Sequence, residues 1–276
     1  MNDMRSILTI LTAVLSISSI ALPRNVFRTD HEAGRAPVIK GVYSGNTDQA
    51  MAEFEAFTGT KMDIYAKFWG WDSDFPETIA GIQGKTLLIF WDPDFGYDEI
   101  NSGSQDEYIA DFARGAKSYG HPVILVPFSE FNLNEAAWGN TIGTNTPEKF
   151  IAAWRLVYNI FQINDVKNVK FGLAYNNVSI PAAPFASFYP GSEYVDYVGV
   201  DGFNMDGQTF AQTFNSALKE VASFGKPVWI FSTGSIKPQQ QFIHDLGESG
   251  LPWIWFNQAP YNINSASLST FQSISQ

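Results

Sequence analysis

Short apolar runs alternate along this chain with longer segments whose apolar residues recur at helical spacing. The short runs have the length and composition of strands buried on both faces, and they lie at 38–44, 63–71, 85–93, 123–127, 170–177, 195–204, 227–234 and 252–259. The amphipathic segments predict helices at 47–58, 76–82, 106–119, from 147 onward, and at 209–224, 238–246 and 265–273. The pattern therefore predicts strands and helices in strict alternation.

Residues that begin and end helices support these boundaries. Thr47 and Thr146 stand where an N-cap is needed, Pro147 occupies the first turn, and Gly59 and Gly120 follow the last apolar positions. Strand and helix in repeated alternation predict an α/β fold, here a single (β/α)8 TIM barrel spanning residues 38–276. A doubly wound open sheet is the alternative, although no glycine-rich phosphate loop follows the first strand.

The first residues have the pattern of an export signal. Arg5 precedes an uncharged apolar run at 7–22, and the small residues at 19–21 suit a signal peptidase. We therefore predict a signal peptide at 1–21, a leader at 22–37 and a secreted product. The alternative is a membrane anchor formed by an uncleaved signal segment. The chain contains no cysteine, which excludes disulfides and a cysteine-linked lipid anchor.

Composition narrows the class of ligand. A net charge of −11 argues against a nucleic-acid partner, and the aromatic content of 15% suits a ligand with flat apolar faces, such as a sugar. The three histidines are isolated and predict no metal site, and no G-x-S-x-G motif supports a serine hydrolase. We expect a monomer that binds a polysaccharide and needs no cofactor.

Polar and aromatic residues gather at the carboxyl ends of the predicted strands, where a barrel builds its active site. Glycoside hydrolysis needs two carboxylates, and Glu130 is the candidate proton donor with Asp201 as its partner. The candidate substrate-binding residues are Trp69, Trp71, Trp91, Asp92, Trp138, Asn176, Asn204, Ser232 and Trp255. For Asp92 and Asp201, binding a substrate hydroxyl or organising a loop remains the alternative to a catalytic role.

Several of these segments resemble glycoside hydrolase family 26, which includes β-mannanases and β-glucanases on a (β/α)8 barrel. The motifs that carry the resemblance are TLLIFWDP at 86–93, PFSEFN at 127–132, YVDYVGVDGFN at 194–204 and KPVWIFSTGS at 226–235, together with the segment 153–177. The likeness extends from residue 41 to about residue 271. It implies that Glu130 is the general acid/base at the end of the fourth strand.

The sequence departs from the family pattern at two places. The family usually has Arg-Pro-x-His-Glu before its acid/base, whereas this chain has Val126-Pro127-Phe128-Ser129-Glu130. The strand-seven position of the family's nucleophilic glutamate is Ser232. Three hypotheses follow: a glycosidase that uses Glu130 with Asp201, a glycosidase-like protein that binds polysaccharide without turnover, and a barrel that serves as a scaffold.

Overall fold

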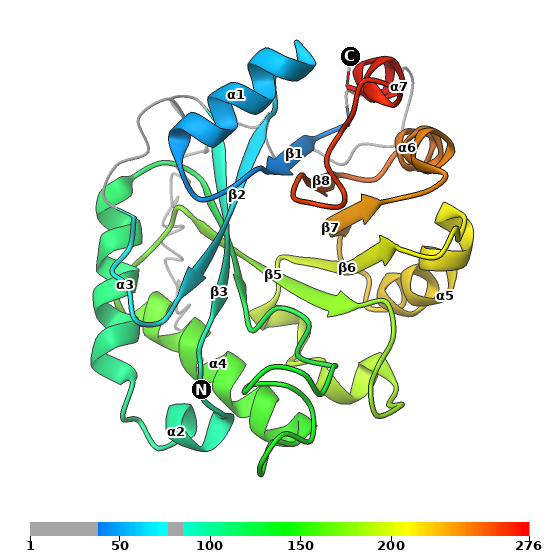
Figure 1. The fold of residues 1–276 in the computed structure, drawn as a ribbon. Helices are drawn as coiled ribbons and strands as arrows, with labels where there is room; N and C mark the ends of the chain where they lie inside the picture. Colours follow the sequence, from blue (N-terminus) through cyan, green and yellow to red (C-terminus); the bar gives the residue numbers. More distant parts are fainter. Residues whose placement is uncertain (1–37, 77–84, 276) are drawn as a thin grey trace, which may run out of the picture.

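The chain folds into a closed barrel of parallel strands (Figure 1). The computed structural model describes residues 38–76 and 85–275. In order around the barrel the strands are β1 (Lys40–Tyr43), β2 (Ile64–Gly70), β3 (Thr86–Asp92), β4 (Val123–Pro127), β5 (Val169–Asn176), β6 (Tyr197–Asn204), β7 (Val228–Ser235) and β8 (Trp253–Phe256). The predicted (β/α)8 barrel is confirmed, and the open-sheet alternative is wrong because β1 pairs with β8.

Helices surround the barrel on its outside (Figure 1). They are α1 (Asp48–Thr58), α2 (Tyr97–Asn101), α3 (Asp106–Tyr119), α4 (Pro147–Ile163), α5 (Phe210–Ala222), α6 (Gln239–Glu248) and α7 (Leu268–Ile274). Two short 3-10 helices, Phe185–Phe188 and Ser192–Tyr194, lie between β5 and β6. The short α2 was not predicted. The predicted helix at 76–82, apart from Pro76, and the predicted signal and leader lie outside the described residues.

The residues that were predicted to begin and end helices do so in the structure. Thr47 and Thr146 accept hydrogen bonds from the backbone N–H groups of Ala50 and Lys149, and Gly59 adopts the left-handed conformation that ends α1. At the start of α5, Thr209 and Gln212 form a capping box. Local sequence therefore fixes where these three helices begin.

Alternate residues of each strand supply two separate hydrophobic layers. One layer fills the barrel, and the other lies between the barrel and its helices. Inside the barrel, Phe231 packs directly against the backbone of β5 and β6. A Cβ at Gly172 or Gly199 would lie only 2.6 or 2.5 Å from the Phe231 ring, so glycine is needed at both positions. This ring closes the barrel interior below its carboxyl end.

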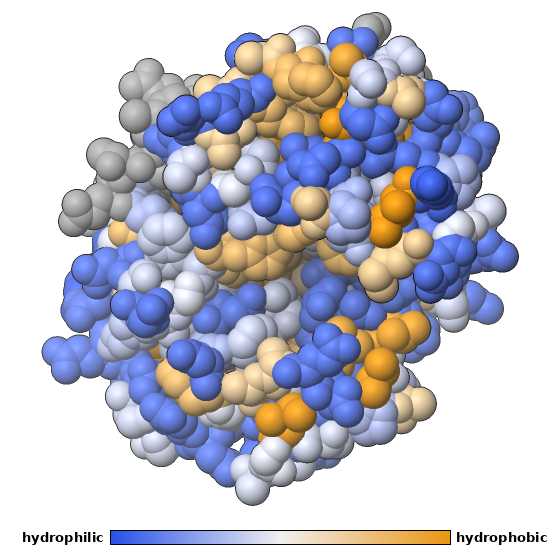
Figure 2. Space-filling model, in the orientation of Figure 1, coloured by the Kyte–Doolittle hydropathy of each residue, from blue (hydrophilic) through white to orange (hydrophobic). Residues whose placement is uncertain are grey.

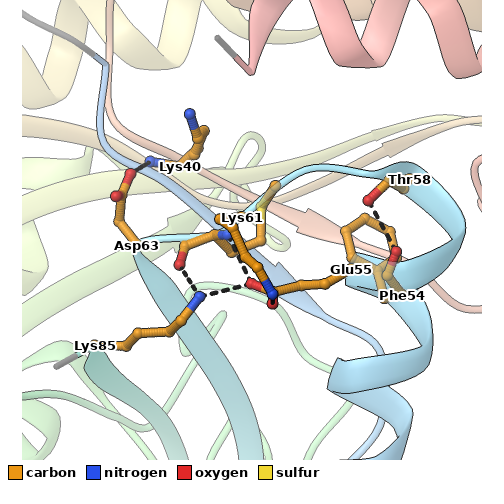
Figure 3. Close-up of polar contacts among 8 residues, drawn as sticks. Lys40, Phe54, Glu55, Thr58, Lys61, Asp63 and Lys85 are labelled. Atoms are coloured by element: carbon orange, nitrogen blue, oxygen red, sulfur yellow. Dashed lines mark hydrogen bonds and ion pairs between the residues drawn. The ribbon is translucent and has the colours of Figure 1, made fainter. Parts of the chain in front are cut away.

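An ionic network around the buried Glu55 joins α1 to the amino-terminal ends of β2 and β3 (Figure 3). Glu55, whose side chain is 7% exposed, accepts hydrogen bonds from Lys61 and Lys85, both at 2.6 Å. Lys85 also donates to the carbonyl of Met62, and the Met62 N–H donates to Glu55. The network lies at the end of the strands opposite to the expected active site, so we assign it to stability.

In the part of the chain that the structure describes, no helix has the length and apolar character needed to cross a membrane.

Candidate active site

Glu130 lies just after β4 on a strained turn. Phe128 and Glu130 both adopt left-handed backbone conformations, with φ of 56° and 54°. Such conformations are unfavourable for residues other than glycine and persist only where neighbouring contacts support them. Here the Phe128 N–H donates to the Trp91 carbonyl and the Glu130 N–H to the Ala174 carbonyl. The turn is thereby tied to β3 on one side and to β5 on the other.

Asp92, at the end of β3, supports the same turn. Its two carboxylate oxygens accept hydrogen bonds from the backbone N–H and from the hydroxyl of Ser129, each at 2.7 Å. Burial raises the pKa of Asp92, the hydrogen bonds from Ser129 lower it, and the charge of Glu130 raises it. The pKa of Asp92 is therefore raised to about 7. Asp92 is therefore a positioning residue for the segment that carries Glu130.

Asn176, at the end of β5, makes the side-chain hydrogen bond to Glu130. Its amide donates to Oε1 of Glu130 at 3.0 Å. Asn132, which is fully buried, holds Asn176 in place by accepting from its backbone N–H and donating to its carbonyl. Burial raises the pKa of Glu130, the Asn176 hydrogen bond lowers it, and the charge of Glu135 raises it, so the net direction is upward. A carboxyl group with a raised pKa suits proton donation.

Asp201 and Ser232 lie side by side because β7 contains a bulge. Val200 pairs with Ile230, but the next residue, Asp201, pairs with Ser232, so Phe231 is an extra residue in β7. Without that insertion, strand alternation would turn Ser232 away from the barrel interior. The bulge therefore brings the side chain of Ser232 next to an acid.

The carboxyl group of Asp201 is buried. The residue is 2% exposed, and its Oδ1 has no hydrogen-bond partner among the described residues. Burial raises its pKa well above the usual range, the charges of Glu130 and Asp92 raise it further, and the Ser232 N–H lowers it. Asp92, Glu130 and Asp201 thus form one electrostatically coupled cluster at the carboxyl end of the barrel, and the pKa of each carboxyl group is raised.

No group of three or more His, Cys, Asp or Glu side chains in the described ranges, 38–76 and 85–275, has a geometry that would hold a metal ion.

The structure contradicts several of the predicted substrate-binding residues. Trp91 and Trp255 are fully buried in the layer between barrel and helices, and Trp71 is buried against Trp91 with ring centroids 4.4 Å apart. Asn204 is also fully buried, and its amide donates to Ser235 and to the Lys237 carbonyl. These four predictions are wrong. Trp91, Asn204 and Trp255 stand next to inward-facing residues, so strand alternation turns their own side chains outward.

Two predicted tryptophans remain partly exposed at the carboxyl end. Trp69 donates its indole N–H to the Asp74 carbonyl at 2.8 Å, and Trp138 donates to the Ser129 carbonyl at 2.8 Å. Both indoles are therefore held in place by the loops around them. Trp138 adds a further contact to the turn that carries Glu130.

An aromatic cluster that was not predicted lies at the carboxyl ends of β1, β2, β6 and β8. Its members are half-buried: Tyr43, Phe68, Phe203, Phe256 and Tyr261. The Tyr43 and Phe256 rings stack with centroids 5.1 Å apart, and Phe203 shares the inward face of β6 with Asp201. Figure 2 shows this side of the molecule with a hollow near its centre, bordered by hydrophobic side chains. Counting two residues forward from Asp201 would have found Phe203, and the same alternation in β1, β2 and β8 would have found Tyr43, Phe68 and Phe256.

Comparisons with known proteins agree with this architecture. The model of glycosyl hydrolase family 26 matches residues 91–270. Endoglucanase H of Acetivibrio thermocellus is 31% identical over 242 residues, an alignment that covers 81% of this chain and 26% of that protein. The chain therefore corresponds to about a quarter of that relative.

Several solved structures with a similar fold are described as mannanases. A GH26 β-mannanase from Bacteroides ovatus matches with a TM-score of 0.67 and 13% identity, covering 88% of this chain and 89% of that chain. A mannanase from Bacillus subtilis matches with a TM-score of 0.62 and 18% identity, covering 84% of each chain. At such identities these structures bear on the fold alone.

Proposed function

Because the chain belongs to glycosyl hydrolase family 26, we propose that it hydrolyses the glycosidic bonds of a β-linked polysaccharide such as β-mannan or β-glucan. The names of the relatives, an endoglucanase and several mannanases, support these two substrates. The half-buried aromatic cluster supports a ligand with flat apolar faces, because planar rings stack on sugars. The negative charge of the chain favours a neutral polysaccharide.

The observation that carries the proposal is the environment of Glu130. Its carboxyl group is held by Asn176, its backbone is strained in a left-handed turn, and its pKa is raised chiefly by burial. These properties suit a general acid that protonates the leaving oxygen of a glycosidic bond. The Ser129 to Asp92 hydrogen bonds fix the segment in which it lies.

Asp201 is the partner carboxylate that we propose. Its Oδ1 is buried and has no hydrogen-bond partner among the described residues, so it can still accept a hydrogen bond. Turnover requires a proton on Glu130 and a negative charge on Asp201, which then directs a water molecule to the anomeric carbon or attacks that carbon itself. Ser232 is a poor nucleophile, because no histidine or lysine base accompanies its hydroxyl in the interactions of this cluster, and its own N–H donates to Asp201.

Export and assembly form part of the same proposal. The Arg5 and apolar 7–22 pattern supports a signal peptide at 1–21 and a secreted product, or an anchored one if the signal is retained. We propose a monomer without cofactor or metal, since the carboxylates and aromatic rings named above suffice for hydrolysis.

A second candidate function follows from Ser232. A glycosidase-like barrel without the family's nucleophile would still present the aromatic cluster and Asn176 to a glycan, and would bind it without cleavage. Burial of Asp201 favours this candidate, because a neutral carboxyl group neither attacks carbon nor activates water.

The test is release of reducing ends from mannans, β-glucans and xylans by the purified protein and by Glu130→Gln and Asp201→Asn. Asp206→Asn is the matched control, because Asp206 is an exposed acid a few residues beyond Asp201. We expect both cluster variants to lose nearly all turnover and the control to retain it. The anomer of the first product then separates inversion from retention.

Each other result has a definite meaning. Turnover that survives Glu130→Gln would remove the assigned proton donor. No turnover by the wild type, together with glycan binding that survives Glu130→Gln, would replace the hydrolase with the binding protein.

A further inference from the structure

A pocket of about 460 Å³ lies beside the carboxyl end of β2 and the connection from β1 to α1. Its walls include Asn46, Asp48, Lys67, Trp69 and Asp74. We call it the β2 pocket. Its volume is that of a site for a small ligand.

The β2 pocket lies on the opposite face of β2 from the barrel mouth. Phe68 packs into the barrel, where its ring stacks on Phe90 with centroids 4.4 Å apart. Lys67 and Trp69, on either side of it, point to the other face because side chains alternate along a strand. A ligand in the pocket is thus separated by one strand from the cluster of Asp92, Glu130 and Asp201.

Trp69 offers a fixed aromatic surface. Its indole N–H donates to the Asp74 carbonyl at 2.8 Å, and its ring is a wall of the pocket while remaining partly exposed. A ring held in this way loses little conformational entropy on stacking against a sugar face.

Lys67 supplies a buried cation with spare hydrogen-bonding capacity. Its side chain is 5% exposed, its ammonium donates to the Asn46 carbonyl, and it lies 3.8 Å from Asp48. Since an ammonium has three donor hydrogens, at least one remains for a ligand hydroxyl after those that face Asn46 and Asp48. Asn46 is itself fixed, because its amide exchanges two hydrogen bonds with the Phe68 backbone at 2.7 and 3.1 Å.

The charges in the pocket select the class of ligand. Asp48 and Asp74 outnumber Lys67, so an anion is disfavoured, while carboxylate and amide oxygens accept hydrogen bonds from hydroxyls. A ring for stacking, a donor and several acceptors together fit a neutral sugar.

We propose that the β2 pocket binds a sugar unit of a neutral β-linked polysaccharide outside the catalytic cluster. The inference rests on the proposed function for the identity of the polysaccharide. It adds a second attachment point, which would raise the effective affinity for long chains without touching the reacting bond.

The test compares Trp69→Ala, Trp69→Phe and Lys67→Met in a Glu130→Gln background, by calorimetric binding of β-mannan and β-glucan. Stacking of this kind contributes roughly 0.5–1.5 kcal/mol, so Trp69→Ala should weaken polysaccharide binding about 3- to 10-fold. Lys67→Met should weaken it as well, and Trp69→Phe should retain most of it. Phe57→Ala is the control, because Phe57 is a 51% exposed aromatic outside the pocket.

Hydrolysis of a short oligosaccharide by Trp69→Ala with Glu130 intact separates this proposal from the function proposed above. Wild-type turnover of the short substrate with weaker polysaccharide binding supports the pocket. Unchanged polysaccharide binding by a folded Trp69→Ala overturns the pocket and leaves hydrolysis standing. Loss of short-substrate turnover in Trp69→Ala would place Trp69 in the catalytic cleft, and this result too would overturn the proposal of a separate β2 pocket. A wild type that neither binds nor cleaves any glycan overturns both proposals.

Discussion

Ser129 donates its backbone N–H and its hydroxyl to the two carboxylate oxygens of Asp92, each at 2.7 Å. Ser129 directly precedes Glu130, and the residues on either side of it have left-handed backbones. Two hydrogen bonds to a partly buried carboxylate are among the stronger polar contacts in a protein. Asp92 therefore determines where the Glu130 carboxyl group lies, although two helices and a strand separate the two residues in the sequence.

Ser129→Ala removes one of these two hydrogen bonds and should lower kcat about 10- to 100-fold, because small displacements of a proton donor cost that much. KM should change little, since no substrate contact is lost. Steady-state kinetics on a soluble polysaccharide would measure this. Ser129→Thr retains a hydroxyl and should keep most of the activity. Equal kcat for Ser129→Ala and wild type would mean that the backbone N–H alone positions Glu130.

The pH dependence of activity should respond to Asn176. Burial raises the pKa of Glu130 and the hydrogen bond from Asn176 lowers it, so Asn176→Ala removes the lowering effect. The pKa of Glu130 then rises, the acid stays protonated to higher pH, and the alkaline limb of kcat/KM moves to higher pH. The measurement is a pH profile of kcat/KM for both proteins.

Asn177→Ala is the matched control for that experiment. The Asn177 amide donates to the Thr213 carbonyl at 2.8 Å, so its loss leaves the Glu130 hydrogen bond in place. A limb that shifts equally in both variants, or that moves to lower pH in Asn176→Ala, would contradict the assignment of that limb to Glu130.

The barrel could be predicted because its signals are local. Each strand is a short apolar run, and Thr47, Gly59, Thr146 and Pro147 mark helix ends through contacts with their immediate neighbours. Strand bounds shifted by a few residues, as when the predicted strand 38–44 became Lys40–Tyr43. The short α2 was missed, because its five residues make too brief a pattern to distinguish from a loop.

The site was harder to predict because it depends on which way each side chain points from its strand and on contacts between neighbouring strands. Trp91 and Asp92 are adjacent, yet only Asp92 faces the cluster, and the tryptophan belongs to the outer core. The bulge that places Ser232 beside Asp201 leaves no mark in the sequence of β7 alone. Similarly, the Asp92 to Ser129 and Asn176 to Glu130 hydrogen bonds exist only once neighbouring strands pair.

Stability should depend on Glu55 at the opposite end of the barrel. Burial by itself would raise the pKa of Glu55, but hydrogen bonds, first those from Lys61 and Lys85, lower it to about 2. Because the folded-state pKa lies below the unfolded value of about 4.3, this stabilisation is complete above that pH and disappears as pH falls toward 2. Glu55→Gln should lower the free energy of unfolding by about 2–3 kcal/mol at pH 7.

Urea unfolding at pH 7 and at pH 3 would measure both effects. The difference in the free energy of unfolding between Glu55→Gln and wild type should be smaller at pH 3, because part of the stabilisation by the ionised Glu55 is lost at that pH. Glu53→Gln is the control, since Glu53 is exposed on the same helix and accepts only from Gln49 among its side-chain contacts with described residues. If the difference in the free energy of unfolding is the same at both pH values, the packing of the Glu55 side chain rather than its charge accounts for the stabilisation.

Ser232→Glu would place a glutamate where the sequence resemblance predicts the family's nucleophile, and it should destabilise the protein. Ser232 is 4% exposed and pairs with Asp201, so the variant adds both volume and a further acid to a buried carboxylate cluster. We expect the free energy of unfolding to fall by about 2–4 kcal/mol. Asp201→Asn removes the neighbouring acid, and in the double variant it should recover about 1 kcal/mol or more.

The same pair of variants distinguishes two reasons why a glutamate would be unfavourable at position 232. If the acid of Asp201 is what makes a glutamate at position 232 unfavourable, the double variant Ser232→Glu/Asp201→Asn should be more stable than Ser232→Glu. The double variant should also release products with retained anomeric configuration, because the new glutamate can attack the sugar. Denaturant unfolding and anomer analysis give the two readouts. A double variant no more stable than Ser232→Glu would mean that the space around Phe231, rather than the carboxyl group of Asp201, disfavours a glutamate there.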